Sequence, residues 1–153
     1  GRRRNSVLPV LQQEFPGPVR ANYGYNLEML RPGVFAVWDG AYFAMIVKGS
    51  DRISFFDFPQ NPFARSDVVV GSRMVDAGLE ILDGEVPDHI DMVYSHDHYD
   101  HFGSSQVAYS ELIGLFPSAV IRIWSSWQVK NRLESRQSQD TPIRAPIPTE
   151  IIE

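Results

Sequence analysis

Three of the four histidines of this 153-residue chain fall within six residues, in the run HDHYDH at positions 96–101. Residues two apart project to the same side of an extended segment, so His96 and His98 can both direct an imidazole at one cation. Asp100 and His101 lie where we expect the chain to turn, and from there they can reach a second cation a few ångströms away. The spacing therefore predicts a metal site formed by a single loop.

The chemistry of the ligands limits which metals such a site could hold. The chain contains no cysteine, so every metal ligand must be nitrogen or oxygen. Imidazole and carboxylate suit zinc, which is the default expectation, and they also suit iron or manganese. The alternative is a solvated polar loop whose histidines cap the following helix. The close spacing of these histidines favours the metal site over that alternative.

Three neighbouring side chains receive other interpretations. By the same alternation Asp97 should point away from the two histidines, as a turn or helix-cap carboxylate. Tyr99 should line the pocket or pack rather than bind metal. His89 follows Pro87-Asp88 at the start of a predicted strand, where a surface or hydrogen-bonding role is expected.

The elements that position this loop can be read from the apolar pattern. Three β-rich runs, separated by the turn pairs Asp39-Gly40 and Gly49-Ser50, predict an antiparallel meander over residues 34–38, 42–47 and 53–56. Strands and helices then alternate. The predicted strands are 90–94 and 119–124, and the predicted helices are 72–82, with Ser72 as N-cap, 105–115 and 126–136. This order predicts an α/β fold with the helices packed on one face of the sheet.

The ends of the chain have a different composition. Residues 1–32 are rich in proline, glycine, asparagine and glutamine, which predicts an irregular lead-in before a domain that spans residues 33–153. Residues 141–149 read as a proline-punctuated linker, and residues 150–153 resemble the start of another strand.

Charge and hydropathy exclude several classes of partner. A formal net charge of −5 and a pI near 5.3 argue against nucleic acid, because affinity for phosphates depends on lysine and arginine. The longest apolar stretches fall far short of the roughly 20 residues that span a bilayer, and no signal peptide is visible. We therefore expect a soluble chain without a membrane partner, and the compartment stays open.

Together these features resemble the metallo-β-lactamase superfamily, whose signature is the His-x-His-x-Asp-His loop. Phe55-Phe56-Asp57 is similar to the family's strand that ends in an aspartate near the metal loop, and residues 92–95 to the strand that delivers the first histidine. The resemblance extends through residues 118–133 to the proline-containing segment 146–149. It covers the chain from about Val34 onward and implies the N-terminal half of an αββα sandwich.

The resemblance implies roles for the loop residues. His96 and His98 would bind a first metal ion, while Asp100 and His101 would bind a second. A water or hydroxide between the metals would attack an ester, lactone, amide or thioester of a small-molecule substrate. Asp100 would act as the catalytic residue that orients this nucleophile, and Asp57 would hydrogen-bond to a ligand imidazole.

Two departures from the family qualify this picture. Asp57 is followed by Phe58-Pro59, where many members have a small residue and glycine. No histidine follows His101, whereas the family completes its site with residues of the C-terminal half. The chain is therefore expected to be an incomplete, inactive fragment whose strands from Val34 to Phe56 pack against a complementary C-terminal half or a second copy. The alternatives are an iron-dependent oxygenase on the same fold and a non-catalytic binding module.

Overall fold

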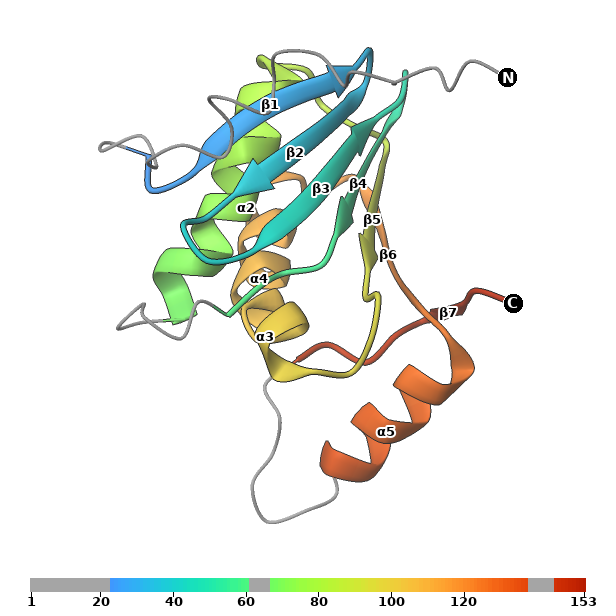
Figure 1. Cartoon of the computed structure of the whole chain (residues 1–153). Coiled ribbons are helices and arrows are strands. Elements are labelled where there is room, and N and C mark those ends of the chain that lie inside the picture. The colour runs from blue at the N-terminus through green and yellow to red at the C-terminus, as the bar shows by residue number, and fades with distance from the viewer. Residues whose placement is uncertain (1–22, 61–66, 138–144) are drawn as a thin grey trace, which may run out of the picture.

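The computed structural model describes residues 23–60, 67–137 and 145–153, which form one mixed β-sheet with helices (Figure 1). The seven strands lie side by side in chain order: β1 (Asn26–Arg31), β2 (Val34–Trp38), β3 (Phe43–Lys48), β4 (Arg52–Phe56), β5 (His89–Val93), β6 (Val120–Ser125) and β7 (Glu150–Ile151). The helices are α2 (Asp67–Leu82), α3 (Tyr99–Phe102), α4 (Ser105–Leu115) and α5 (Trp127–Gln137). None of these helices of the described residues is long and apolar enough to cross a membrane. The predicted α/β class is confirmed.

Strands β1 to β4 form an antiparallel meander, as the spacing of the β-rich runs predicted. The turn between β2 and β3 is closed by Asp39, whose Oδ1 accepts hydrogen bonds from the backbone amides of Ala41 and Tyr42 at 2.9 and 2.7 Å. Gly40 adopts a φ of 98° in this turn, a conformation that glycine reaches without strain. The Asp39-Gly40 pair is therefore a true hairpin signal.

The expectation of an irregular lead-in up to residue 32 is wrong for its last part, because residues 26–31 form strand β1. Leu27 and Met29 pair with Val37 and Phe35 of β2. Pro32 and the following glycine, which suggested a loop, make the tight turn that joins the two strands, and the glycine has a φ of 77°. Residues 26–31 form a strand because they pair with β2, and their own amino-acid composition does not predict this.

The second half of the sheet is parallel, since β4, β5, β6 and β7 run in the same direction with helices between them. The predicted order of strands and helices is confirmed, with a shift at the first helix. Helix α2 begins at Asp67, so Ser72 lies inside it and is not its N-cap; the Ser72 hydroxyl donates to Glu111 of α4 at 2.6 Å. The three valines at positions 68–70 have low helix propensity, which is why local pattern placed the start too late.

The core lies between the sheet and helices α2 and α4, which lie behind the sheet in Figure 1. Alternate residues of β4 and β5 fill it, namely Ile53, Phe55, Ile90 and Met92, each no more than 1% exposed. Burying such a side chain contributes roughly 1.5–3 kcal/mol. A Cβ at Gly78 of α2 would lie 2.6 Å from Cζ of Phe55, so the helix approaches β4 this closely only because that residue is glycine.

The opposite face of the meander is apolar and open. Strand register places Phe43 beside Trp38 and Met45 beside Phe56 on this face. The rings of Trp38 and Phe43 pack with centroids 4.6 Å apart, yet Phe43 remains 51% exposed. None of the described helices lies over this face in Figure 1. One side of the sheet is thus covered by helices, and the other presents half-buried aromatic and aliphatic side chains.

Candidate metal centre

The histidine loop begins where β5 ends, at Val93, and leads into the short helix α3. Asp57 follows the end of β4, the parallel neighbour of β5. Because the carboxyl ends of parallel strands meet at one edge of a sheet, the two segments come together there. The backbone confirms this contact, since the amide of Asp57 donates to the carbonyl of Val93 at 2.9 Å and the amide of Phe58 to the carbonyl of His101 at 2.7 Å.

Asp57 lies beneath the loop, as expected, and both of its carboxylate oxygens accept hydrogen bonds. Oδ1 accepts from the backbone amide of Ser95 at 2.8 Å, and Oδ2 accepts from the Ser95 hydroxyl at 2.6 Å. Oδ2 also lies 3.2 Å from Nδ1 of His101. The backbone of Asp57 has a φ of 65°, in the left-handed region that aspartate tolerates better than most residues. This conformation turns the carboxylate under the loop.

These contacts orient two imidazoles. Nδ1 of His96 lies 2.8 Å from the Ser95 hydroxyl, which itself donates to Asp57. With protons on Nδ1, His96 donates to Ser95 and His101 donates directly to Asp57. Each ring then keeps Nε2 as an unprotonated atom with a free lone pair, the form in which histidine binds metal. The chain of contacts through Asp57 therefore selects the metal-binding tautomer of both residues.

The structure places the four sequence-predicted ligands near one another in pairs. The ring centroids of His96 and His98 are 4.8 Å apart, and those of His96 and His101 are 4.0 Å apart. Asp100 Oδ2 lies 3.8 Å from Nε2 of His101. Two ligand atoms on one zinc ion, each bonded at about 2.0–2.2 Å, lie within about 4 Å of each other, so the separation between Asp100 and His101 suits a shared cation.

Among the described residues, the group of three whose ligand atoms all lie within 4.8 Å of one another is Asp57, His96 and His101, without His98 or Asp100. The hydrogen bonds argue against Asp57 as a direct ligand, since both of its oxygens are already engaged. A carboxylate that holds ligand histidines from behind is a common arrangement in metal sites. We therefore place Asp57 behind the histidine loop, as a group that orients ligands.

Tyr42, from the β2–β3 turn, also contacts the histidine loop. Its ring packs edge-on against His101 with centroids 5.8 Å apart. Partial burial raises the pKa of the Tyr42 hydroxyl, and Asp100 raises it further through its charge and a hydrogen bond. Sequence reasoning missed Tyr42 because it lies more than fifty residues before the loop in the chain, and the meander brings it there.

Asp97 points away from the predicted ligands, as the alternation predicted, but it is neither a turn nor a helix-cap carboxylate. It is buried, and its two oxygens pair with Arg132 at 2.8 Å and Arg136 at 3.0 Å, both on α5. Burial alone would raise the pKa of Asp97, but the hydrogen bond from Arg132 and the charges of both arginines outweigh it and lower the pKa. The sequence carried no signal for these arginines beyond their helical spacing.

The remaining predicted positions lie outside the centre or at its rim. Tyr99 is 47% exposed and packs edge-on against Phe102 at 5.8 Å, which agrees with a packing role. His89 begins β5, at the opposite end of the strand from the loop. Its Nδ1 is buried and has no hydrogen-bond partner among the described residues, so the expected hydrogen-bonding role is not seen at that atom.

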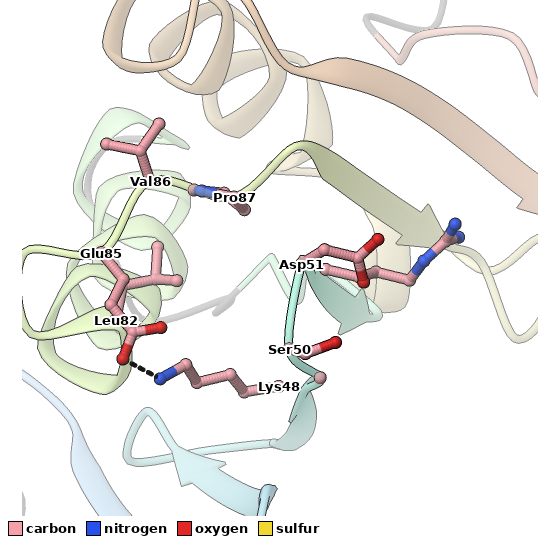
Figure 2. A pocket seen from close by; sticks show the side chains of 9 residues that line it. Lys48, Ser50, Asp51, Leu82, Glu85, Val86 and Pro87 are labelled. Atoms are coloured by element: carbon pink, nitrogen blue, oxygen red, sulfur yellow. Dashed lines mark hydrogen bonds and ion pairs between the residues drawn. The ribbon is translucent and has the colours of Figure 1, made fainter.

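Two concavities formed by described residues lie away from the histidine loop. Figure 2 shows a small pocket at the amino end of β4 and β5, where Lys48 pairs with Glu85 at 2.6 Å. Its volume of about 10 Å³ accommodates no more than a water molecule. A wider groove of about 390 Å³ is lined by α2 and α4, including Val75, Leu79 and Leu115, and by no residue of the loop.

No family model and no curated protein sequence matches this chain. Its fold, however, matches solved metallo-β-lactamases. The enzyme from Cronobacter sakazakii aligns with a TM-score of 0.57 over 86% of this chain and 48% of its own length, at 12% identity. A mutant of that enzyme gives a TM-score of 0.56, over 84% and 47% of the two chains, at 14% identity.

A third neighbour is a subclass B3 metallo-β-lactamase of Bradyrhizobium japonicum, with a TM-score of 0.54 and 15% identity over 94% of this chain and 49% of its own. At such identities the match shows the fold alone. The chain spans about half the length of these structures. The predicted fold, half of a metallo-β-lactamase-type sandwich, is therefore confirmed.

Proposed function

We propose that this chain provides the N-terminal half of the metal centre of a metallo-β-lactamase-type hydrolase. His96 and His98 would hold one metal ion, and Asp100 and His101 a second. The observation that carries the proposal is the orientation of the imidazoles: Nδ1 of His96 and Nδ1 of His101 are both tied, directly or through Ser95, to Asp57. That arrangement leaves Nε2 of each ring for a cation.

The donor set fits zinc, and iron or manganese would also be compatible. A bound metal of this kind supplies a nucleophile at neutral pH by lowering the pKa of water to about 7. The substrate would be a small molecule with an ester, lactone, amide or thioester bond. Asp100, half-buried and beside His101, would accept a hydrogen bond from the attacking water and direct it at the carbonyl.

The centre in this chain is incomplete as a catalyst. Four ligands shared by two metals leave two for each, whereas catalytic zinc commonly has three protein ligands. The open face of β2 to β4, with Trp38, Met45 and Phe56, provides a surface on which a second sheet could pack. We propose that a complementary C-terminal half, or alternatively a second copy of the chain, covers this face and supplies the missing ligands.

Metal binding can be tested with a matched pair of histidine variants. The chain should bind Zn²⁺ in a chelator competition assay, and His96→Ala should lower the affinity at least about tenfold. His89→Ala removes the one histidine outside the loop and should leave the affinity unchanged. Thermal melts of the metal-free proteins show whether either variant unfolds. Equal Zn²⁺ affinity in all three proteins would contradict the metal site.

Activity can be tested by complementation with a panel of ester, lactone, amide and thioester substrates. We expect turnover only after the C-terminal half is added, and His96→Ala should abolish it. Full turnover by residues 1–153 alone would contradict the fragment assignment. Preferential retention of iron would favour the oxygenase alternative, and a metal-loaded complex without turnover would favour a binding module.

A further inference from the structure

A second cluster of charged groups connects Asp97 of the histidine loop to helix α5, and the proposed reaction does not use it. The carboxylate of Asp97 is paired through Oδ1 with Arg132 at 2.8 Å and through Oδ2 with Arg136 at 3.0 Å. Arg136 also donates from Nη1 to the main-chain carbonyl of Asp97 at 2.8 Å. Both the side chain and the backbone of this residue are therefore held from α5.

The position of Asp97 in the chain makes these contacts consequential. It separates His96 from His98, so its backbone angles determine how the two imidazoles are directed relative to each other. Their ring centroids are 4.8 Å apart, while the Asp97 carboxylate between them in the chain is buried against the arginines of α5. A contact that fixes the main chain of Asp97 thereby fixes the spacing of both rings.

The arginines come from a helix that buries two apolar side chains. Val129 and Leu133 are 5% and 0% exposed, so one face of α5 is buried in the core. Arg132 and Arg136 are four residues apart and therefore neighbours on another face of the same helix. In Figure 1 α5 lies at the same end of the sheet as α3, the helix that completes the loop. Rigid elements position a site more accurately than loops do.

We infer that Arg132 and Arg136 are positioning residues that preorganise His96 and His98 for metal binding through their contacts with Asp97. This inference rests on the proposed function, because it concerns the same metal centre. Without the arginines the Asp97 carboxylate would be an unpaired buried charge, which is energetically costly. The loop would then rearrange to expose the carboxylate to water, and the imidazoles of His96 and His98 would no longer be held in their present arrangement.

The two arginines should differ in importance. Arg136 holds both the carboxylate and the main chain, and its side chain is 40% exposed, whereas Arg132 holds only the carboxylate and is 63% exposed. Contacts that orient metal ligands typically contribute 10- to 100-fold in affinity. We expect Arg136→Gln to lower Zn²⁺ affinity about 10- to 100-fold, and Arg132→Gln to lower it less. The milder Arg132→Gln remains informative if Arg136→Gln does not fold.

A matched control is available elsewhere in the chain. Arg52 pairs with the buried carboxylate of Asp91 at 2.8 Å, with a side chain 38% exposed, so its environment resembles that of Arg136. Arg52→Gln should reduce thermal stability to a similar degree while leaving Zn²⁺ affinity unchanged. The d–d absorption spectrum of bound Co²⁺ adds a readout of ligand geometry, which should change in Arg136→Gln and not in Arg52→Gln.

A double-variant test shows whether Arg132 affects Zn²⁺ affinity through its contact with Asp97 or only through its positive charge. Among the described residues, the polar contact of Arg132 is with the Asp97 carboxylate, so Arg132→Gln should have little further effect on Zn²⁺ affinity in an Asp97→Asn background. If the two substitutions instead lower the affinity independently, Arg132 does not act through Asp97 and the inference is overturned.

The outcomes also separate this inference from the proposed function. If wild-type protein binds no Zn²⁺ or His96→Ala binds it equally well, the proposed function fails. If wild-type protein binds Zn²⁺, His96→Ala does not, and Arg136→Gln binds as wild type does, the site stands and the inference is wrong. Loss of affinity in Arg136→Gln together with retention in Arg52→Gln supports the inference.

Discussion

Two buried aspartates, six residues apart in the chain, show how the same kind of contact serves different purposes in two regions. Asp91 and Asp97 are each 5% exposed, and each pairs with an arginine at 2.8 Å. Asp91 sits within β5, and its partners come from the neighbouring strands: Arg52 and Ser54 of β4, and the indole of Trp124 of β6, whose Nε1 donates at 2.7 Å.

The partners of Asp97 are both on α5, and they follow it in the chain by 35 and 39 residues. Asp91 therefore joins strands whose register already brings these residues side by side, whereas Asp97 links a loop to an element outside the sheet. Removal of the first carboxylate should affect the sheet alone. Removal of the second should affect the metal loop, because only there does the contact determine the conformation of neighbouring ligands.

The largest expected effect is on stability, from Asp91→Ala. This substitution leaves Arg52 and the indole of Trp124 without their shared acceptor, and breaking a buried pair typically costs about 3 kcal/mol or more. Urea denaturation should show a loss near the low end of that range, because Arg52 is partly exposed. Zn²⁺ affinity of the folded protein should not change. A weaker site in Asp91→Ala would mean that the two regions are coupled.

A smaller effect should distinguish two serines that donate to carboxylates in the two regions. Ser95 donates to Asp57 at 2.6 Å and contacts His96, whereas Ser54 donates to Asp91 at 3.1 Å. Ser95→Ala should lower Zn²⁺ affinity about tenfold, because it removes the link that orients the His96 ring. Ser54→Ala should cost about 1 kcal/mol of stability and leave the affinity unchanged. Competition titrations and denaturation of both variants give the comparison, and equal affinities would remove the role assigned to Ser95.

The smallest effect concerns Asp76 on α2, where partial desolvation raises the carboxyl pKa above its ordinary value of 3.8 and no described cation offsets the shift. A raised pKa in the folded state means that the folded protein favours the protonated form. Stability should therefore fall as pH rises from about 3.8 through the folded pKa, then level off. Asp76→Asn should be slightly more stable than wild type at neutral pH and equal to it below pH 3.8. Melting temperatures across this range test the sign, and a variant less stable at pH 7 would contradict it.

Local pattern determined much of this protein. The histidine spacing identified the four candidate ligands, and the hairpin turns, the alternation of strands and the periodic helices were all visible because each depends on near neighbours in sequence. Asp57 was also found, through resemblance to a family motif. Its hydrogen bonds to Ser95 confirm the expected position beneath the loop.

What only the tertiary structure decided depends on contacts between distant residues. Strand β1 exists because β2 offers it a partner, although its own composition suggests a loop. Tyr42 reaches Asp100 and His101 because the β2–β3 turn lies at the same edge of the sheet as the metal loop. The pairing of Asp97 with Arg132 and Arg136 requires α5 to pack beside that loop. From the sequence alone, a charged helix face is predicted to be exposed to solvent. Periodicity shows which residues share a face of the helix, but it does not show which other element packs against that face.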